Sequence, residues 1–312
     1  MKAIVLKDFG SVDNLVIKKI PEPVLSDNEV SVQVKAISVN PVDAKVRAGR
    51  GLAAKLKEFD PIILGWDISG VVTESKSPLF KAGDEVFGMV NFPGHGKAYA
   101  EYVAAPAAHL ALKPGNITHE EAAAATLAAL TAFQMLVTHG RVKAGQRLLI
   151  HAGAGGVGHY AVQIAKHLGA YVVATASAAN KDFVISLGAD QHIDYHAVDF
   201  EKVVSDIDFV LDPFGEEYID RSLKVMKKGG TIISIVTGKS EPVAAKASEM
   251  GMTGKFCLVQ SDGENMKEIA GLLEKGIVIS HVSQTFHFDE MAKAHLQIES
   301  GRTKGKLVVL TN

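Results

Sequence analysis

Cysteine is almost absent from this chain of 312 residues, since Cys257 is the only one. A single thiol cannot form an intramolecular disulfide, and it cannot build a zinc site of several cysteines. Long hydrophobic runs are missing as well. The most apolar tract, Ala122–Leu136, covers about 15 residues, fewer than the roughly 20 that cross a bilayer. Thr126, Thr131 and Gln134 interrupt it, so we expect a buried helix here.

An excess of charge of one sign is also missing, because 33 basic residues face 35 acidic ones and the formal net charge is -2. This balance provides no broad positive surface for nucleic acid or for an anionic membrane. The opening segment, MKAIVLKDFG, is too short and too polar for a secretory signal. With 47% hydrophobic and 22% charged residues, we expect a soluble cytoplasmic protein with no nucleic-acid or membrane partner.

The first third of the chain has the pattern of short strands, in which β-branched or alternating apolar residues are separated by Gly, Pro, Asp and Ser. No long helical period occurs there, so we predict a mainly β lobe. The expected strands are Lys2–Leu6, Val30–Ala36, Gly70–Val72, Glu85–Gly88 and Tyr99–Ala104.

The pattern changes at Thr118–Glu121, where a threonine followed three residues later by a glutamate is typical of a helix start. Strands and helices then alternate, and the strands are apolar on both faces, which predicts a doubly wound parallel sheet. The expected strands are Arg147–His151, Tyr171–Ala176, Asp190–Asp194, Ile207–Leu211 and Thr231–Val236. The expected helices are Val157–Leu168, Lys181–Leu187 and Glu217–Met226, the last closed by Gly229 and Gly230.

The last part of the chain returns to mixed character. We expect a strand at Phe256–Gln260, helices at Gly263–Lys275 and Asp289–Ser300, and a final strand at Lys306–Leu310. The length suggests two domains. We expect residues 1–117 and 261–312 to form one of them and residues 118–260 to form the other.

A glycine-rich segment lies between the strand Arg147–His151 and the helix that follows it. Its sequence, G-A-G-G-V-G, consists of Gly153, Ala154, Gly155, Gly156, Val157 and Gly158. Small residues at this point allow a sharp turn and a close approach of the backbone to a pyrophosphate, which the free N–H groups of the helix start can bind. The strand–loop–helix context makes a dinucleotide site the better interpretation, and a turn that is glycine-rich by chance is the alternative.

The end of the next strand indicates which dinucleotide binds. NAD sites place an acidic residue about 20 residues after the glycines, where it holds the ribose hydroxyls. The segment Thr175–Lys181 contains no Asp or Glu and instead offers the Ser177 hydroxyl and the Lys181 amine, which suit a 2′-phosphate. We therefore predict NADPH, although Lys181 could also be an ordinary solvated helix residue.

Longer motifs along the chain resemble one family. The segment Gly145–Lys166, including Gln163 and Lys166, is similar to the pattern of the quinone oxidoreductases (zeta-crystallin type). These form the zinc-independent branch of the medium-chain dehydrogenase/reductase superfamily. Further matching segments are Asn40–Asp43, Gly65–Gly70, Lys81–Val86 and Gly301–Lys306. Within the family, Ser261–Gly263 and Ala174–Ser177 are most similar to the NADPH-dependent enone/alkenal and quinone reductases.

The resemblance implies an α/β fold: a Rossmann domain with a doubly wound parallel sheet, and a mainly β, GroES-like catalytic domain. It also implies a homodimer, formed through the sheet edge at Thr231–Val236 and Phe256–Gln260. The zinc-dependent relatives carry their ligands where this chain has Asn40, Trp66 and Asp67. Because tryptophan cannot bind zinc and the chain lacks the four cysteines of their structural zinc lobe, we expect no metal.

Candidate site residues also follow from the resemblance. Asn40 would contact the nicotinamide or the substrate carbonyl, or else be a turn residue before Pro41. Asp43 would order the same loop, or else transfer a proton. Thr126 would lie near the nicotinamide, or else be a buried threonine bonded to a carbonyl one turn back. Tyr195 would meet the adenosine phosphate, or else be a half-exposed aromatic residue.

The loops after the fourth and fifth strands of the sheet would flank the nicotinamide, since ligands bind at the carboxyl ends of such strands. They contribute Asp212, Phe214 and Val236. We find no convincing general acid. His95, Lys97 and Tyr99 are close in sequence but could be loop residues only, and water could supply the proton.

The sequence thus predicts an NADPH-dependent oxidoreductase that transfers hydride to a quinone or an α,β-unsaturated carbonyl without zinc. One alternative is a zinc-type alcohol dehydrogenase, which the residues at the ligand positions disfavour. The other is a non-catalytic NADPH-binding structural or sensor protein, which no sequence feature excludes. The identity of the acceptor stays open.

Overall fold

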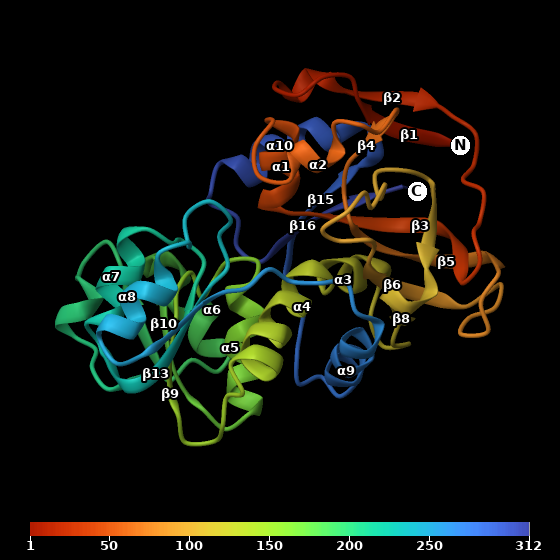
Figure 1. The fold of residues 1–312 in the computed structure, drawn as a ribbon. Helices are drawn as coiled ribbons and strands as arrows, with labels where there is room; N and C mark the ends of the chain where they lie inside the picture. The colour runs from red at the N-terminus through yellow and green to blue at the C-terminus, as the bar shows by residue number, and fades with distance from the viewer. Residues whose placement is uncertain (312) are drawn as a thin grey trace. The chain divides into compact units, whose positions relative to one another are not determined.

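A computed structural model describes residues 1–311 (Figure 1). The chain divides into two compact units. Unit 1 comprises Met1–Leu130 and the residues from Gln260 onward, and unit 2 comprises Thr131–Val259. The helix α3 (His119–Ala124) contacts β3, β5 and β16 of unit 1, so the division falls after this helix rather than before it.

Unit 1 is built on a seven-stranded sheet with the order β15-β16-β3-β5-β6-β8, and β7 pairs with β3 off this path. Its strands are β3 (Glu29–Val39), β5 (Asp67–Ser75), β6 (Glu85–Met89), β7 (Tyr102–Pro106), β8 (Leu110–Leu112), β15 (Val282–His287) and β16 (Lys306–Leu310). A three-stranded sheet has the order β2-β1-β4 and consists of β2 (Leu15–Lys19), β1 (Lys2–Leu6) and β4 (Ile62–Ile63). The strand β16 runs antiparallel to β3 and so joins the sheet of the N-terminal lobe.

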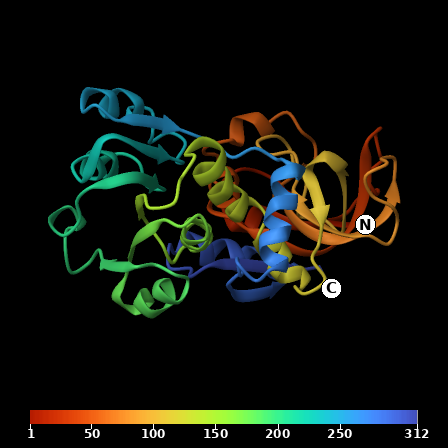
Figure 2. The ribbon, with the colours of Figure 1, turned by 90° about the horizontal axis from the view of Figure 1, so that it is seen from below.

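Short helices complete unit 1. Pro41 begins α1 (Pro41–Arg47), where a fixed φ and a missing N–H suit a first helical position. Asp262 caps α9 (Gly263–Glu274) by accepting a hydrogen bond from the Asn265 N–H at 2.9 Å. The helix α9 contacts β8 and lies beside it in the ribbon of Figure 2. The remaining helices are α2 (Ala53–Leu56) and α10 (Met291–Glu299).

Unit 2 contains a six-stranded parallel sheet with the order β11-β10-β9-β12-β13-β14. The strands are β9 (Arg147–Ile150), β10 (Tyr171–Ala176), β11 (Gln191–Asp194), β12 (Ile207–Asp212), β13 (Met226–Ser234) and β14 (Thr253–Phe256). Counted along the chain this order is 3-2-1-4-5-6, the Rossmann order, whose direction reverses between β9 and β12. The structure confirms the expected α/β class and the doubly wound sheet.

Helices cover both faces of this sheet. The cluster formed with α7 (Glu217–Leu223) and α8 (Val243–Glu249) buries Leu149, Val173, Val210 and Ile232 from four neighbouring strands. The other helices, α5 (Gly158–His167) and α6 (Lys181–Ser186), also pack on strands of the sheet. Each fully buried aliphatic side chain stabilises the fold by about 1.5–3 kcal/mol, which explains why these strands are apolar on both faces.

Three sequence predictions need correction. The apolar tract after Thr118 is not one helix, because α3 ends at Ala124, α4 (Leu127–Phe133) begins anew, and a π-helix covers Gln134–His139. The predicted helix at Glu217–Met226 ends at Leu223, and Gly229 and Gly230 lie inside β13, which starts early because Met226 pairs with Ile207. The predicted strand Phe256–Gln260 lies earlier, at Thr253–Phe256.

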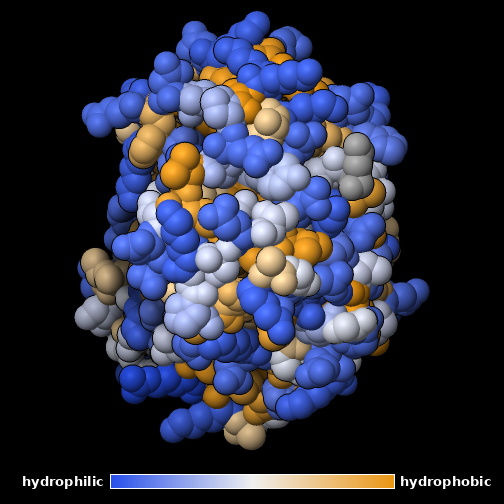
Figure 3. Space-filling view, turned by 90° about the vertical axis from the view of Figure 1, so that its right-hand side faces the viewer, coloured by the Kyte–Doolittle hydropathy of each residue, from blue (hydrophilic) through white to orange (hydrophobic). Residues whose placement is uncertain are grey.

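The surface in Figure 3 is mainly hydrophilic, with apolar residues scattered over it in small groups, as is normal for a globular protein. Among the helices of residues 1–311, none combines the length and the apolar character that a membrane span requires.

Candidate cofactor and active sites

The glycine-rich loop joins β9 to α5 in unit 2 and has no room for a side chain at Gly153 or Gly158. The N–H of Gly153 donates to the carbonyl of Thr175 at 2.8 Å, which fixes the loop to the end of β10. A Cβ on Gly153 would lie 2.8 Å from the Cβ of Ala174, and one on Gly158 would lie 2.0 Å from the carbonyl oxygen of Ala152. Ala152 itself has a positive φ of 51°. The turn is therefore possible only with bare backbone at these positions.

The start of α5 is suited to a bound anion. The helix has 10 residues, and its N-cap, Val157, makes no side-chain capping bond. Gly155, Gly156 and Val157 are half-buried, so the loop backbone is accessible. Free N–H groups and the positive end of the helix dipole favour phosphate here. The loop and the helix start therefore have the features of an anion-binding site.

His151, a buried histidine that the sequence analysis missed, forms hydrogen bonds next to the glycine-rich loop. The His151 ring lies 3.2 Å from the Thr175 hydroxyl through Nδ1 and 3.0 Å from the Ser222 hydroxyl through Nε2. The N–H of Ala152 also donates to the Thr175 hydroxyl at 3.2 Å. Burial lowers the pKa of His151 to about 3, so the ring is neutral. A histidine that directly follows an apolar strand was the only signal of this role in the sequence.

The ends of β10 and β11 place Ser177, Lys181 and Tyr195 at one edge of the sheet. Ser177 is half-buried, and its hydroxyl accepts a hydrogen bond from the Asn180 amide at 3.2 Å. Lys181 is exposed at the start of α6, and Tyr195, just after β11, is 48% exposed. No carboxylate occurs between Thr175 and Lys181. The exposed Lys181 amine and the Ser177 hydroxyl are therefore groups that can bind a phosphate.

Asp212, at the end of β12, turns its side chain into the protein. Its carboxylate accepts the N–H of Phe214 at 2.9 Å and the hydroxyl of Ser234 at 2.7 Å. Burial raises the pKa of Asp212, and these hydrogen bonds oppose the rise. Asp212 is fully buried. Its carboxylate thus orders the loop after β12 and does not itself reach the surface.

The loop after β13 is tied to the same network. The hydroxyls of Ser234 and Ser240 lie 2.6 Å apart, and that of Ser240 donates to the carbonyl of Val236 at 2.7 Å. Val236 is buried, whereas Phe214 is 40% exposed. The two loops at the carboxyl ends of β12 and β13 are therefore fixed by one set of buried polar groups.

In unit 1, Asn40 lies in a buried polar cluster at the end of β3. Its amide Nδ2 donates to Asp67 Oδ2 at 2.7 Å, and its Oδ1 accepts a hydrogen bond from the Lys306 amine. The backbone N–H of Asn40 donates to Asp43 Oδ2 at 2.7 Å, which caps α1. Asn40 is only 1% exposed, so both ends of its amide are engaged within unit 1.

The charges of this cluster perturb one another. Burial raises the pKa of Asp43 to about 7, and the nearby Asp67 adds to the rise. Burial also raises the pKa of Asp67, against the attraction of Lys306. The pKa of Lys306 is lowered by burial, while Asp67 and Asp43 oppose this. The sequence analysis missed Lys306, although it lies in a motif that carried the resemblance.

Thr126 is placed beside the same cluster. Its hydroxyl donates to the carbonyl of Ala123 at 2.7 Å, one turn back in the helix, and it also interacts with Asp67. The other carboxylate oxygen of Asp67 accepts the N–H of Leu127 at 3.1 Å, where α4 begins. Thr126 is fully buried. The Thr126 side chain therefore forms its hydrogen bonds within unit 1, at the break between α3 and α4.

The residues at the zinc-ligand positions of the zinc-dependent relatives do not form a metal site. Trp66 is 1% exposed, and its indole N–H donates to the carbonyl of Gly94 at 2.7 Å. Tyr99, also fully buried, lies 2.9 Å from His295 Nε2, and burial lowers the pKa of His295 to about 3. Within residues 1–311, no three His, Cys, Asp or Glu side chains come together in a way that could hold a metal ion.

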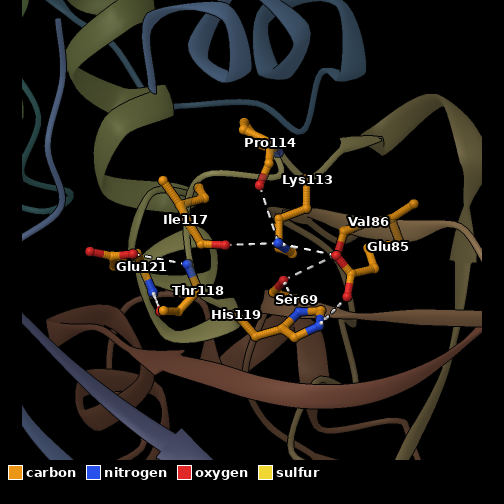
Figure 4. A network of polar contacts seen from close by, with 9 residues as sticks. All are labelled: Ser69, Glu85, Val86, Lys113, Pro114, Ile117, Thr118, His119 and Glu121. Atoms are coloured by element: carbon orange, nitrogen blue, oxygen red, sulfur yellow. Dashed lines mark hydrogen bonds and ion pairs between the residues drawn. The ribbon is translucent and has the colours of Figure 1, made fainter. Parts of the chain in front are cut away.

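A serine, a histidine and a glutamate do meet elsewhere in unit 1. Figure 4 shows His119, at the start of α3, between Ser69 on β5 and Glu85 on β6, at 2.8 Å and 3.3 Å respectively. Ser69 is fully buried, and its hydroxyl also donates to the carbonyl of Val86. A nucleophile must reach a substrate, so this arrangement anchors the helix to the sheet and is not a hydrolytic triad. The Lys113 amine, 3.1 Å from Glu85, joins the same network.

A Rossmann sheet with a glycine-rich βα turn, combined with a separate β lobe that carries a buried polar cluster, defines a dinucleotide-dependent oxidoreductase. Two family models match the chain: "Alcohol dehydrogenase GroES-like domain" over residues 26–115 and "Zinc-binding dehydrogenase" over residues 187–309. The chain belongs to the medium-chain dehydrogenase/reductase superfamily, in the branch of the zeta-crystallin-like quinone oxidoreductases.

Individual relatives agree with this placement. The chain is 35% identical to 2-methylene-furan-3-one reductase of Solanum lycopersicum and 36% identical to the chloroplastic NADPH-dependent alkenal/one oxidoreductase of Arabidopsis thaliana. Each match covers 99% of this chain and 79% of the relative. The solved structure of the quinone oxidoreductase from Coxiella burnetii matches with a TM-score of 0.95 and 37% identity, over 100% of this chain and 99% of that one.

Proposed function

We propose that this protein is an NADPH-dependent reductase that transfers hydride to a quinone or an α,β-unsaturated carbonyl without a zinc ion. The observation that carries the proposal is the loop at Gly153–Gly158, which has no room for a side chain at Gly153 or Gly158 and leads directly into the start of α5. The names of the relatives support the cofactor and both acceptor classes.

Each part of the cofactor has a proposed place in unit 2. Gly153, Ala154, Gly155, Gly156 and Val157 would hold the pyrophosphate at the helix start. Ser177 and Lys181 would bind the 2′-phosphate, and Tyr195 would lie against the adenosine phosphate. The loops ordered by Asp212, which include Phe214 and Val236, would flank the nicotinamide.

When bound, NADPH supplies a hydride to an electron-poor alkene or quinone, and solvent supplies the proton that completes the reduction. The residues of the chain bind the cofactor and the acceptor and orient them. Asp43 caps the helix after Asn40, and Asn40 fixes the end of β3 through Asp67. Exposed Phe214 provides an apolar surface on a loop that Asp212 holds rigid.

The zinc-free character rests on Trp66, which is buried at a position where the zinc-dependent relatives have a ligand. A homodimer is also part of the proposal. The outer strand of the unit 2 sheet, β14, pairs with β13 on one side only, and its residue Phe256 is 41% exposed. An unpaired sheet edge of this kind can pair with a second copy.

The proposal is tested by following NADPH oxidation with a panel of quinones, enones and enals, in the presence and absence of a chelator. We expect turnover with at least one acceptor class and no effect of the chelator. Chelator-sensitive oxidation of alcohols would indicate a zinc-type alcohol dehydrogenase instead. Tight NADPH binding with no turnover on any acceptor would indicate a structural or sensor protein. Comparing one quinone with one enal would then identify the preferred acceptor.

A further inference from the structure

We propose that Lys306 is a positioning residue for the reaction: its buried ammonium group holds the Asn40 amide and balances Asp67 at the place where relatives would carry a metal ion. This inference rests on the proposed function and on the resemblance, by which Asn40 would contact the substrate carbonyl.

Strand pairing brings the amine to this point. Lys306 is the first residue of β16, which pairs antiparallel with β3 so that Leu307 lies opposite Val39. The Lys306 amine donates to Asn40 Oδ1 and, at 3.5 Å, to the carbonyl of Val39. Lys306 is only 3% exposed. A buried ammonium group is costly unless its hydrogen bonds and charge are satisfied, so its position indicates a specific requirement.

The charge balance of the cluster depends on this one amine. Asp43 and Asp67 are both fully buried. The other nearby cation, Arg47, forms an ion pair with Glu299 at 2.5 Å and also donates to the carbonyl of Gly10. Arg47 is thereby already neutralised. Lys306 is left as the cation that opposes Asp67 and Asp43.

The amide of Asn40 has one favourable orientation in this field. A lysine amine can only donate and a carboxylate can only accept. The oxygen of the amide must therefore face Lys306 and its nitrogen must face Asp67, as observed. If the Asn40 amide were flipped, its NH2 group would face the Lys306 amine and its oxygen would face the Asp67 carboxylate, and neither pair could form a hydrogen bond. Through Asp67 the same arrangement holds the Leu127 N–H, where α4 begins. Lys306 thus fixes two backbone segments, at Asn40 and at Leu127.

The test is a double-variant cycle with Lys306→Met and Asp67→Asn. Lys306→Met keeps the length of the side chain but leaves Asp67 without a counter-charge, and we expect a loss of kcat of about ten-fold or more through misplacement of the Asn40 loop. NADPH affinity should stay unchanged, since the residues proposed to hold the phosphates of the cofactor lie in unit 2. Lys35→Met is the matched control on β3, because the Lys35 amine bonds only Gln33 in the observed network, and it should leave kcat unchanged.

The double variant distinguishes charge balance from simple packing. Removing both charges should raise the Tm and the kcat above those of Lys306→Met alone. If Lys306 acted only through packing, the losses of Tm and kcat caused by Lys306→Met and by Asp67→Asn would add in the double variant. That result would overturn the proposal. A Lys306→Met enzyme with wild-type kcat would overturn it as well. If the wild-type protein reduces no acceptor, the proposed function fails. The Tm cycle would then still show whether Lys306 balances Asp67, and additive Tm losses would overturn that as well.

Discussion

A Cβ atom on Gly158 would lie 2.0 Å from the carbonyl oxygen of Ala152. The carbonyl belongs to the backbone and the backbone fixes the position of a Cβ, so neither atom can rotate away as the end of a long side chain would. Gly158→Ala must therefore displace either the loop or the start of α5. We expect NADPH affinity to fall by about ten-fold or more and the free energy of unfolding to fall by about 2 kcal/mol. Fluorescence titration with NADPH and urea unfolding measure the two effects.

Gly271→Ala is the matched control for this change. Gly271 lies within α9 of unit 1, and a Cβ there would meet no atom within 4 Å. Alanine is the better helix former, so this variant should be slightly more stable, by about 0.5–1 kcal/mol. Its NADPH affinity should equal that of the wild type. A Gly158→Ala protein with unchanged affinity would show that the loop does not hold the pyrophosphate.

The choice between NADPH and NADH can be altered at Ser177. An acidic residue at the end of the second strand holds the ribose hydroxyls of NADH and repels a 2′-phosphate. Ser177→Asp should therefore raise the KM for NADPH by about ten-fold or more and lower the KM for NADH. Steady-state kinetics with both cofactors measure the ratio. Ser205→Asp makes the same change of charge in an exposed loop of unit 2 and should leave the ratio unaltered. Equal effects of the two variants would contradict the prediction.

The sheet of unit 2 could be predicted well because its signals are local. Apolar runs bounded by glycine place β10 and the ends of α5 and α6 within about one residue of their observed limits. The break between α3 and α4 could not be predicted in this way. Its cause is a hydrogen bond from the Leu127 N–H to Asp67, a residue far away in the sequence.

The same distinction applies to the candidate site. The glycine-rich loop is a continuous motif, so its residues can be named from the sequence. Lys306 meets Asn40 only because β16 pairs with β3. His151 meets Ser222 only because α7 packs onto the sheet. The partners of such residues depend on long-range pairing, which the sequence around them does not reveal.

Buried His151 makes the stability of unit 2 dependent on pH. Its pKa in the folded protein is lowered to about 3 from an ordinary value of 6.5. The unfolded chain therefore takes up a proton below pH 6.5 that the folded protein does not. The stabilisation is complete above this pH and is lost as the pH falls toward 3, at up to about 1.4 kcal/mol per pH unit.

His151→Gln should remove this dependence. We expect the variant to be less stable than the wild type at neutral pH by about 1–3 kcal/mol, because hydrogen bonds to Thr175 and Ser222 are weakened. The difference should shrink as the pH falls, since glutamine does not titrate. Urea unfolding at several pH values measures it, and His196→Gln, at an exposed position, should show no such trend. A difference that stays constant with pH would contradict a neutral buried ring.

Asp43 should make the stability of unit 1 depend on pH in the opposite direction. Burial raises its pKa from 3.8 to about 7, so between these values the folded protein keeps a proton that the unfolded chain has released. The contribution of Asp43 to stability is complete below pH 3.8 and is lost as the pH rises through 7. Asp43→Asn cannot titrate, yet its side-chain oxygen can still accept the N–H of Asn40.

The advantage of wild type over Asp43→Asn in free energy of unfolding should therefore decline as the pH rises from about 4 to 7, by up to about 1.4 kcal/mol per pH unit. Urea unfolding of both proteins across this range measures the decline. The exposed Asp27→Asn is the matched control and should track the wild type at every pH. If Asp43→Asn also runs parallel to the wild type, Asp43 is ionised throughout. In that case Lys306 would face two full negative charges at neutral pH, and the loss caused by Lys306→Met should be correspondingly larger.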